Sequence, residues 1–255
     1  MQPDKTIDHI VRWLGDYCDN AGLKGFVVGV SGGIDSAVTS TLCAMTGKEV
    51  ILLNMPIHQD PHQVSLSHQH IEWLEQRHGR VRGVQTDLTP VFQSFEQVLP
   101  STVQDGLTMA NTRSRLRMIT LYAFAGHHKM LVAGTGNKVE DFGVGFYTKY
   151  GDGGVDISPI ASLMKSEVYA LSRALGILEA IQNAPPTDGL WTDNRTDENQ
   201  IGATYAELEW AMQFEDSAGD EAQLYERQKA VLSIYRKFHQ ANKHKMEPIP
   251  VAKIP

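Results

Sequence analysis

One stretch of the chain most constrains its fold: residues 29–36 read GVSGGIDS and directly follow the short apolar run Phe26-Val27-Val28. A buried strand that leads into paired glycines and then into small residues predicts a strand, a loop and a helix. Glycines let the loop N–H groups point into one concavity, and the start of the helix adds the positive end of its dipole. The loop lacks the lysine of the Gly-x-x-x-x-Gly-Lys-Ser/Thr pattern, so we expect a phosphate site of another kind.

Hydrophobic patterning along the chain alternates between strands and helices. Apolar runs predict strands at residues 26–30, 50–55, 81–86 and 130–133, and helical spacing predicts helices at 4–21, 36–46, 62–78, 88–99, 108–127, 165–175, 203–215 and 219–242. This alternation predicts an α/β fold with a Rossmann-like, doubly wound parallel sheet flanked by helices. Such sheets bind ligands beyond the carboxyl ends of their strands. Glycine-rich turns follow Val30 and Ala133, and both can therefore face one crevice.

Three segments lack regular periodicity. Residues 137–163 hold several glycines and charges, and a long irregular stretch inside a domain is more often functional than ordinary. Residues 184–200 are rich in Pro, Asp, Asn and Thr, which predicts a mobile loop. The proline-containing tail after residue 242 is expected to lie extended over the surface.

Composition excludes several classes of protein. The formal net charge of −7 argues against nonspecific binding to nucleic acid or anionic membrane. No apolar run approaches the ~20 residues needed to span a bilayer, and the polar, acidic N-terminus is unlike a secretory signal. Cys18 and Cys43 lie apart on predicted helices. We expect buried, reduced thiols and a cytoplasmic protein.

A second set of motifs decides the family. Residues 134–140 read GTGNKVE, residues 145–156 read GFYTKYGDGGVD, and Lys165 follows in SLMKSEV. Together with SGGIDS, these strings resemble ammonia-dependent NAD synthetase, of the PP-loop ATP pyrophosphatase superfamily, from the first strand to about Thr187. The resemblance implies an adenine nucleotide alpha hydrolase-like fold. It also implies ATP-dependent amidation of deamido-NAD with ammonia through an adenylated intermediate, with release of AMP and pyrophosphate.

The resemblance also implies a set of residues that bind ATP and Mg²⁺. Asp35 and Glu140 match the magnesium carboxylates, and Asp35 and Lys165 are expected to be catalytic. A carboxylate beside a polyphosphate is repelled unless a divalent cation intervenes, which independently favours Mg²⁺ at Asp35. Lys165 offers a point charge for phosphate oxygens. The full ATP set comprises Gly29, Val30, Ser31, Gly32, Gly33, Ile34, Asp35, Ser36, Thr135, Lys165 and Thr187.

Deamido-NAD contacts in the family match Arg115, Lys149, Asp156, His244 and Lys245. Only the family match selects Arg115 from its neighbouring arginines. The pair His244-Lys245 is the weaker transfer, because basic residues at a helix end are usually solvated or complement the dipole. Here Met246 and Glu247 also replace further basic residues that follow the pair in the family.

Asp152 lies between Gly151 and Gly153. We hypothesise that this carboxylate is catalytic, binding or deprotonating ammonium. The helix that contains His68 and His70 is polar, and we expect both imidazoles to be solvated.

Rival interpretations remain within and beyond the superfamily. One is another PP-loop enzyme, such as a GMP synthetase core or a tRNA-modifying ligase, although basic patches and a placed cysteine pair are absent from the sequence. The other is a regulatory nucleotide-binding module without catalysis. Such a module could lose Asp35, Glu140 or Lys165, and this chain retains all three.

Length bears on the nitrogen source. Glutamine-dependent relatives carry an additional amidase domain with a nucleophilic cysteine, so we expect one NAD synthetase domain over 1–255, no glutaminase domain, and use of free ammonia. Family members are homodimers, and we expect the same here. Six side chains are equally compatible with core and interface: Trp73, Phe92, Phe95, Leu121, Tyr122 and Phe124.

Overall fold

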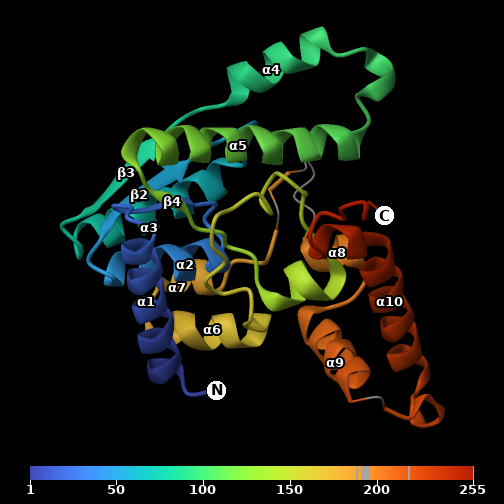
Figure 1. The fold of residues 1–255 in the computed structure, drawn as a ribbon. Helices are drawn as coiled ribbons and strands as arrows, with labels where there is room; N and C mark the ends of the chain where they lie inside the picture. The colour runs from blue at the N-terminus through green and yellow to red at the C-terminus, as the bar shows by residue number, and fades with distance from the viewer. Residues whose placement is uncertain (188, 191–195, 218, 255) are drawn as a thin grey trace.

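The computed structural model describes residues 1–187, 189–190, 196–217 and 219–254 (Figure 1). Its strands are β1 (Gly25–Gly29), β2 (Glu49–Asn54), β3 (Val81–Gln85) and β4 (Leu131–Val132). Its helices are α1 (Pro3–Asn20), α2 (Ile34–Met45), α3 (Pro61–Glu75), α4 (Thr89–Val98), η1 (Ser101–Val103), α5 (Gly106–His128), η2 (Val139–Val144), α6 (Lys165–Ala174), α7 (Glu179–Gln182), α8 (Asp197–Ile201), α9 (Tyr205–Asp216), η3 (Glu221–Gln223) and α10 (Glu226–Met246).

The four described strands form one sheet in the order β3-β2-β1-β4, and every pair is parallel. The chain runs from β1 outward through β2 to β3, and then crosses to β4 on the other side of β1. The strand order therefore reverses beside β1, where ligands bind in sheets of this kind. The predicted α/β fold with a doubly wound parallel sheet is confirmed.

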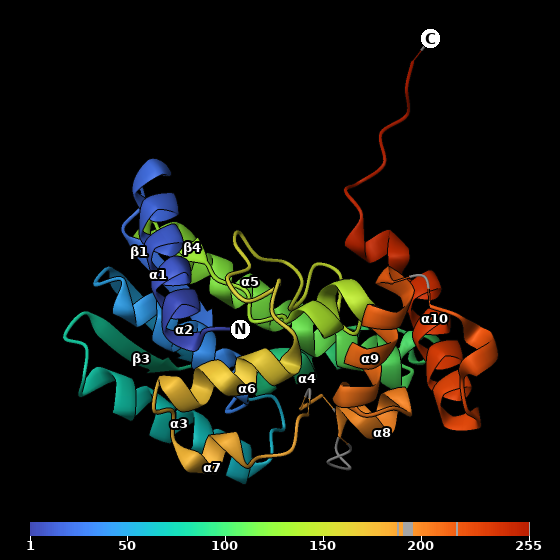
Figure 2. The ribbon, with the colours of Figure 1, turned by 90° about the horizontal axis from the view of Figure 1, so that it is seen from below.

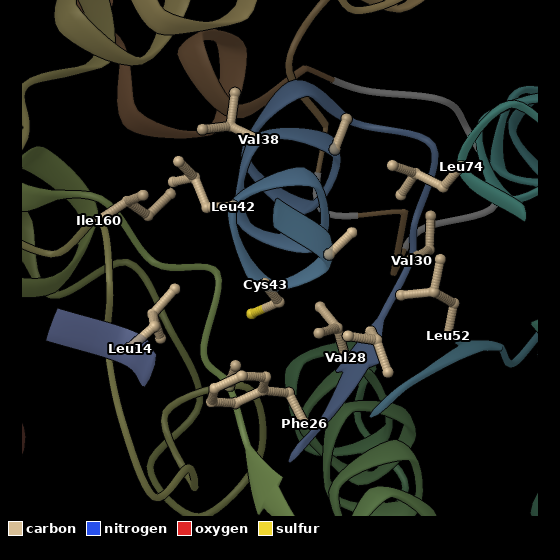
Figure 3. Packing of buried hydrophobic residues seen from close by; sticks show 14 of the residues in the cluster. Leu14, Phe26, Val28, Val30, Val38, Leu42, Cys43, Leu52, Leu74 and Ile160 are labelled. Carbon is tan, nitrogen blue, oxygen red and sulfur yellow. The ribbon is translucent and has the colours of Figure 1, made fainter. Parts of the chain in front are cut away.

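The two faces of the sheet bury alternate residues of its strands. Phe26 and Val28 of β1 pack in one apolar cluster with residues of α1, α2, α3 and α6 (Figure 3). Val27 lies on the opposite face with residues of α4 and α5. Figure 1 shows α4 and α5 on one side of the sheet and α1, α2 and α6 on the other. Side chains of successive strand residues point to opposite faces, so a continuous apolar run fits a strand covered twice.

The C-terminal helices pack around a separate apolar cluster. Residues of η2, α8, α9 and α10 form this cluster, which includes Val139, Leu208 and Val231. Figures 1 and 2 show these helices beside the sheet region rather than over its faces. After α10 the tail extends away from the body of the protein, with its described residues exposed (Figure 2).

Three predicted segments differ from the structure. The helix predicted at 219–242 begins at Glu226 and ends at Met246, because the short turn η3 and extended backbone at Tyr225 precede it. The loop predicted at 184–200 contains the start of α8, where the Thr196 hydroxyl accepts from Asn199 N. Part of that prediction, residues 188 and 191–195, lies outside the described residues. The irregular segment 137–163 contains the π-helix η2, which the hydrophobic periodicity did not predict.

The prediction that His70 is solvated was wrong. Its side chain is fully buried between α3 and α2, where Nε2 lies 2.9 Å from the Ser40 hydroxyl. Its ring also stacks on Trp73. Burial lowers the pKa of His70 to about 4. The inner face of α3 carries polar residues because each has a polar partner: the Ser67 hydroxyl donates to Val30 O, and His70 pairs with Ser40 of α2.

Other predictions about single side chains have definite outcomes. Cys18 and Cys43 are buried free thiols, as expected. Among the six ambiguous apolar residues, Phe92 is fully buried in the core whereas Phe95 and Tyr122 are exposed on α4 and α5. Across the described residues, the structure contains no helix with the length and apolar character required to cross a bilayer.

Candidate active site

The glycine loop between β1 and α2 is held by its own serines. Gly33 N donates to the Ser31 hydroxyl at 3.2 Å, and the Ser36 hydroxyl donates to Gly33 O at 2.9 Å. Gly32 has a φ of +90°, and a Cβ there would lie 2.6 Å from the carbonyl oxygen of Gln63. The backbone conformation and the close neighbour both require glycine. The loop is thus shaped before any ligand binds.

A cavity of about 250 Å³ opens beside this loop. Residues 29–31 and 33–36 line it together with residues 133–136, which follow β4. The two glycine-rich turns therefore face one crevice, at the position where the strand order reverses. Helix α2 begins at Ile34 and points its N-terminus toward the cavity lining, where unpaired helical N–H groups favour an anion.

Lys165 joins two carboxylates inside this cavity. Its Nζ donates to Asp35 Oδ2 at 2.5 Å and to Glu140 Oε1 at 3.0 Å. The lysine side chain is 3% exposed and each carboxylate 17%. Burial disfavours the charged lysine, but attraction to the two carboxylates outweighs it and raises the pKa of Lys165. Burial also raises the pKa of Asp35, although Lys165 opposes that effect. Three charges from distant parts of the chain thus meet at one point.

Glu140 is carried by the π-helix η2, and Asn137 organises its start. Asn137 Oδ1 accepts from the backbone N–H groups of Val139 and Glu140 at 3.1 and 3.2 Å. Asn137 Nδ2 donates to Asp35 Oδ1 at 3.1 Å. One buried side chain therefore links the turn that carries Glu140 to the carboxylate at the start of α2. Short π-helices are frequent at functional sites.

The pair Asp35 and Glu140 fits a magnesium ion better than a metal held by protein alone. Within the described part of the chain, no group of three or more His, Cys, Asp or Glu side chains could hold a metal. The two carboxylates nevertheless converge on a single cationic group, the Lys165 ammonium. Mg²⁺ in nucleotide enzymes commonly uses one or two carboxylates and completes its shell with phosphate oxygens and water. The donor set therefore suits a cation that arrives with a nucleotide.

Three further aspartates line the cavity, and they are Asp141, Asp152 and Asp197. Asp152 Oδ1 accepts from the Ser114 hydroxyl at 2.6 Å and from Thr148 N at 3.0 Å. Burial raises the pKa of Asp152, and these hydrogen bonds oppose the rise. Burial and the nearby carboxylates, Glu140 foremost, raise the pKa of Asp141 to about 8. Carboxyl groups crowd this acidic side of the cavity, and a bound cation would stabilise their ionised forms, so this side suits a cationic ligand.

Comparisons with known proteins agree with this arrangement. Residues 6–249 match the family model for NAD synthase. The chain belongs to the NAD synthase family. It is 35% identical over 263 residues to the NH(3)-dependent NAD(+) synthetase of Methanosarcina acetivorans, with both chains covered completely. It is 40% identical over 207 residues to that of Alkaliphilus oremlandii, covering 79% of this chain and 82% of the other. The structure of NMN synthetase from Francisella tularensis superposes with a TM-score of 0.87 at 30% identity, and both chains are covered completely.

Membership of the NAD synthase family confirms the resemblance predicted from the motifs, and makes the protein a ligase. The residues that the resemblance assigned to ATP are gathered by the fold. All of them except Gly32 line the cavity, including Thr135 and Thr187 from distant turns. Gly32 lies against Gln63 and Leu66 of α3 instead.

The residues that the resemblance assigned to deamido-NAD lie outside the cavity lining. Four of them form a linked group at the end of α10. Arg115 Nη2 donates to Lys149 O at 3.4 Å, and Lys149 Nζ donates to His244 O at 2.8 Å. Lys245 Nζ donates to the carbonyl oxygens of Gly145 and Tyr147 at 2.5 and 2.6 Å.

Asp156, the fifth residue assigned to deamido-NAD, is separate from that group. Its carboxylate accepts from Val132 N at 2.8 Å and from the Tyr122 hydroxyl at 3.0 Å, beside β4. These contacts tie the segment after the TKYGDGG motif to the sheet.

Several residues of the site were not identified from sequence. The Tyr205 hydroxyl lies 2.5 Å from Glu140 Oε1, although 65 positions separate the two residues along the chain. Asp197 Oδ2 lies 3.1 Å from the same hydroxyl. No local pattern marks either residue. Asn137 lies within the GTGNKVE motif, and its place in the motif was the one signal available.

Proposed function

We propose that the protein catalyses the ATP-dependent amidation of deamido-NAD with ammonia, releasing AMP and pyrophosphate. One observation carries the proposal: the glycine loop, Lys165 and two carboxylates from separate turns meet in one cavity. This arrangement suits cleavage of ATP between its α and β phosphates, because the loop offers N–H groups to the departing pyrophosphate. The curated relatives support ammonia and NAD as the nitrogen source and product.

The chain's own residues have separate tasks in this reaction. Lys165 neutralises charge on the phosphates, and Ser31 and Ser36 keep the loop in shape. Asp35 and Glu140 would hold Mg²⁺, which supplies charge neutralisation across the phosphates when it is bound. The nicotinate carboxylate attacks the α-phosphorus of ATP, and pyrophosphate leaves. Ammonia then attacks the carbonyl carbon of the adenylated nicotinate, and AMP leaves as the amide forms and a proton is released. The protein contributes chiefly by aligning the reactants.

Asp152 is proposed to receive ammonium at the acidic side of the cavity. Its carboxylate is fixed by Ser114 and Thr148 and faces the cavity. An Asp152→Asn variant should therefore raise the KM for ammonium and lower kcat, with a smaller effect on the KM for ATP. An unchanged ammonium KM and kcat would remove Asp152 from this role.

A second candidate substrate is nicotinic acid mononucleotide, whose amidation gives NMN. The full-length match to the Francisella tularensis NMN synthetase favours it. So does the position of His244 and Lys245, which contact the chain's own backbone and lie outside the cavity lining.

The test compares both substrates in one assay. The protein is incubated with ATP, MgCl₂ and ammonium and with either deamido-NAD or nicotinic acid mononucleotide, and kcat/KM is measured from NAD or NMN together with AMP. The proposal expects the larger kcat/KM for deamido-NAD, and the reverse selects the second candidate. Formation of ADP and orthophosphate, or pyrophosphate release that responds only to RNA, would contradict both. Parallel reactions with glutamine in ammonia-free buffer should give negligible product.

We further propose a cytoplasmic homodimer formed through α4 and α5. Exposed apolar side chains on this face support it, and they are Val91, Phe95, Val98, Leu107 and Ile119. Light scattering coupled to size-exclusion chromatography measures the mass directly. A monomer at micromolar concentration would contradict the dimer without affecting the proposed reaction.

A further inference from the structure

Tyr205 touches both charged partners at the centre of the site. Its hydroxyl donates to Glu140 Oε1 at 2.5 Å, and its ring lies 4.5 Å from the Lys165 ammonium. The residue is 6% exposed and occupies the first position of α9. A capping box between Thr204 and Glu207 fixes the start of that helix. Tyr205 is therefore held rigidly against the cluster.

The hydrogen bonds to Glu140 are distributed unequally over its two oxygens. Tyr205 and Lys165 both donate to Oε1. Within the described part of the chain, no hydrogen bond reaches Oε2. Two donors on one oxygen set the plane of the carboxylate and leave the other oxygen available to a cation.

We propose that Tyr205 is a positioning residue for the divalent cation. Its hydroxyl holds the Glu140 carboxylate in the orientation in which Oε2 and Asp35 bind the metal. The inference rests on the metal role proposed above for Asp35 and Glu140. Residues that hydrogen-bond metal ligands commonly alter metal affinity by 10–100-fold when they are removed. Through Tyr205 the helical region around α9 acts directly on the metal site.

The competing view is that Tyr205 only packs the helical region. It belongs to the same apolar cluster as Tyr235, which offers a matched control. Tyr235 is 7% exposed on α10 and stacks on His239. Removing the Tyr235 hydroxyl alters the same apolar cluster, but it removes no hydrogen bond to Glu140.

The experiment measures, by electron paramagnetic resonance, the Kd for the Mn²⁺ complex of α,β-methylene-ATP, which cannot be cleaved between its α and β phosphates, so no turnover is required. Four proteins form a cycle: the wild type, Tyr205→Phe, Glu140→Gln and the double variant. Tyr205→Phe should weaken Mn²⁺ binding about 10-fold. In the Glu140→Gln background the same change should have no further effect, because Tyr205 acts through Glu140. Tyr235→Phe should keep the wild-type Kd, and melting temperatures establish that each variant is folded.

Each outcome separates the inference from the function on which it rests. If Glu140→Gln binds Mn²⁺ as tightly as the wild type, the proposed metal role fails. If Glu140→Gln weakens binding but folded Tyr205→Phe does not, the inference fails and the metal role stands. Equal weakening by Tyr205→Phe in both backgrounds would also overturn it, since the effect would then not pass through Glu140.

Discussion

The sheet region and the helical region at the C-terminus contribute to the site in different ways. The sheet region buries alternate strand residues on two faces and presents backbone groups of the glycine loop at the edge of the sheet. The helical region has its own smaller core and reaches the site with polar side chains, such as Tyr205. The sheet region thus forms the glycine loop, and the helical region orients a carboxylate.

Helix α10 illustrates the second contribution. His239, Asn242 and Lys245 follow one another at intervals of three residues, and they contact the carbonyl oxygens of Gly143, Val144 and Gly145, respectively. These carbonyls lie at the end of η2, where helical C=O groups lack partners within the helix. A single polar stripe on α10 therefore fastens the turn that carries Glu140.

The largest expected effect comes from breaking the junction of the two regions. Lys165→Ala should lower kcat about 1,000-fold, because the phosphates and the two carboxylates would lose the buried cation that they share. Steady-state kinetics measures this loss. Lys229→Ala is the control, since its pairing with Glu226 is exposed and should matter little. If Lys165→Ala lowers kcat less than tenfold, the prediction that Lys165 links the two regions in catalysis is wrong.

Buried His70 should make the stability of the sheet region depend on pH. The pKa of buried His70 is lowered to about 4 from 6.5. The folded state therefore binds the proton less readily than the unfolded state. The free energy of unfolding is highest above pH 6.5, and it falls as the pH decreases toward 4. The expected loss between pH 7 and 4.5 is about 2–3 kcal/mol.

Urea unfolding at the two pH values measures the contribution of His70. In a His70→Gln variant, the pH-dependent loss should be smaller by about the same 2–3 kcal/mol. An identical pH dependence in the wild type and the variant would show that another group causes it.

The smallest effect is expected in the helical region. Asn242→Ala removes the hydrogen bond to Val144 O and should lower the free energy of unfolding by about 1 kcal/mol. If the polar stripe fastens η2, the KM for MgATP should also rise severalfold. Gln240→Ala, on the exposed face of α10, serves as the control. If Asn242→Ala leaves the KM for MgATP unchanged, the polar stripe contributes to stability and not to the position of Glu140.

The residues that could be predicted share a local signal. The glycine loop, β1 and the start of α2 are adjacent in sequence, so their geometry follows from residue types at short range. His70 could not be assigned correctly, because its partner Ser40 lies 30 positions earlier on another helix. The π-helix η2 was missed for a similar reason: its terminal carbonyls are satisfied by side chains of α10 about 100 positions away.

The sequence by itself determined the alternating strands and helices, the glycine loop and the family. Hydrophobic period and glycine placement are local properties, and motifs preserve them in order along the chain. Only the tertiary structure decided which charges meet. The contacts of Lys165 with Asp35 and Glu140, and of Tyr205 with Glu140, join segments 25 to 130 positions apart. Such pairings depend on how helices pack around the sheet, which no short stretch of residues encodes.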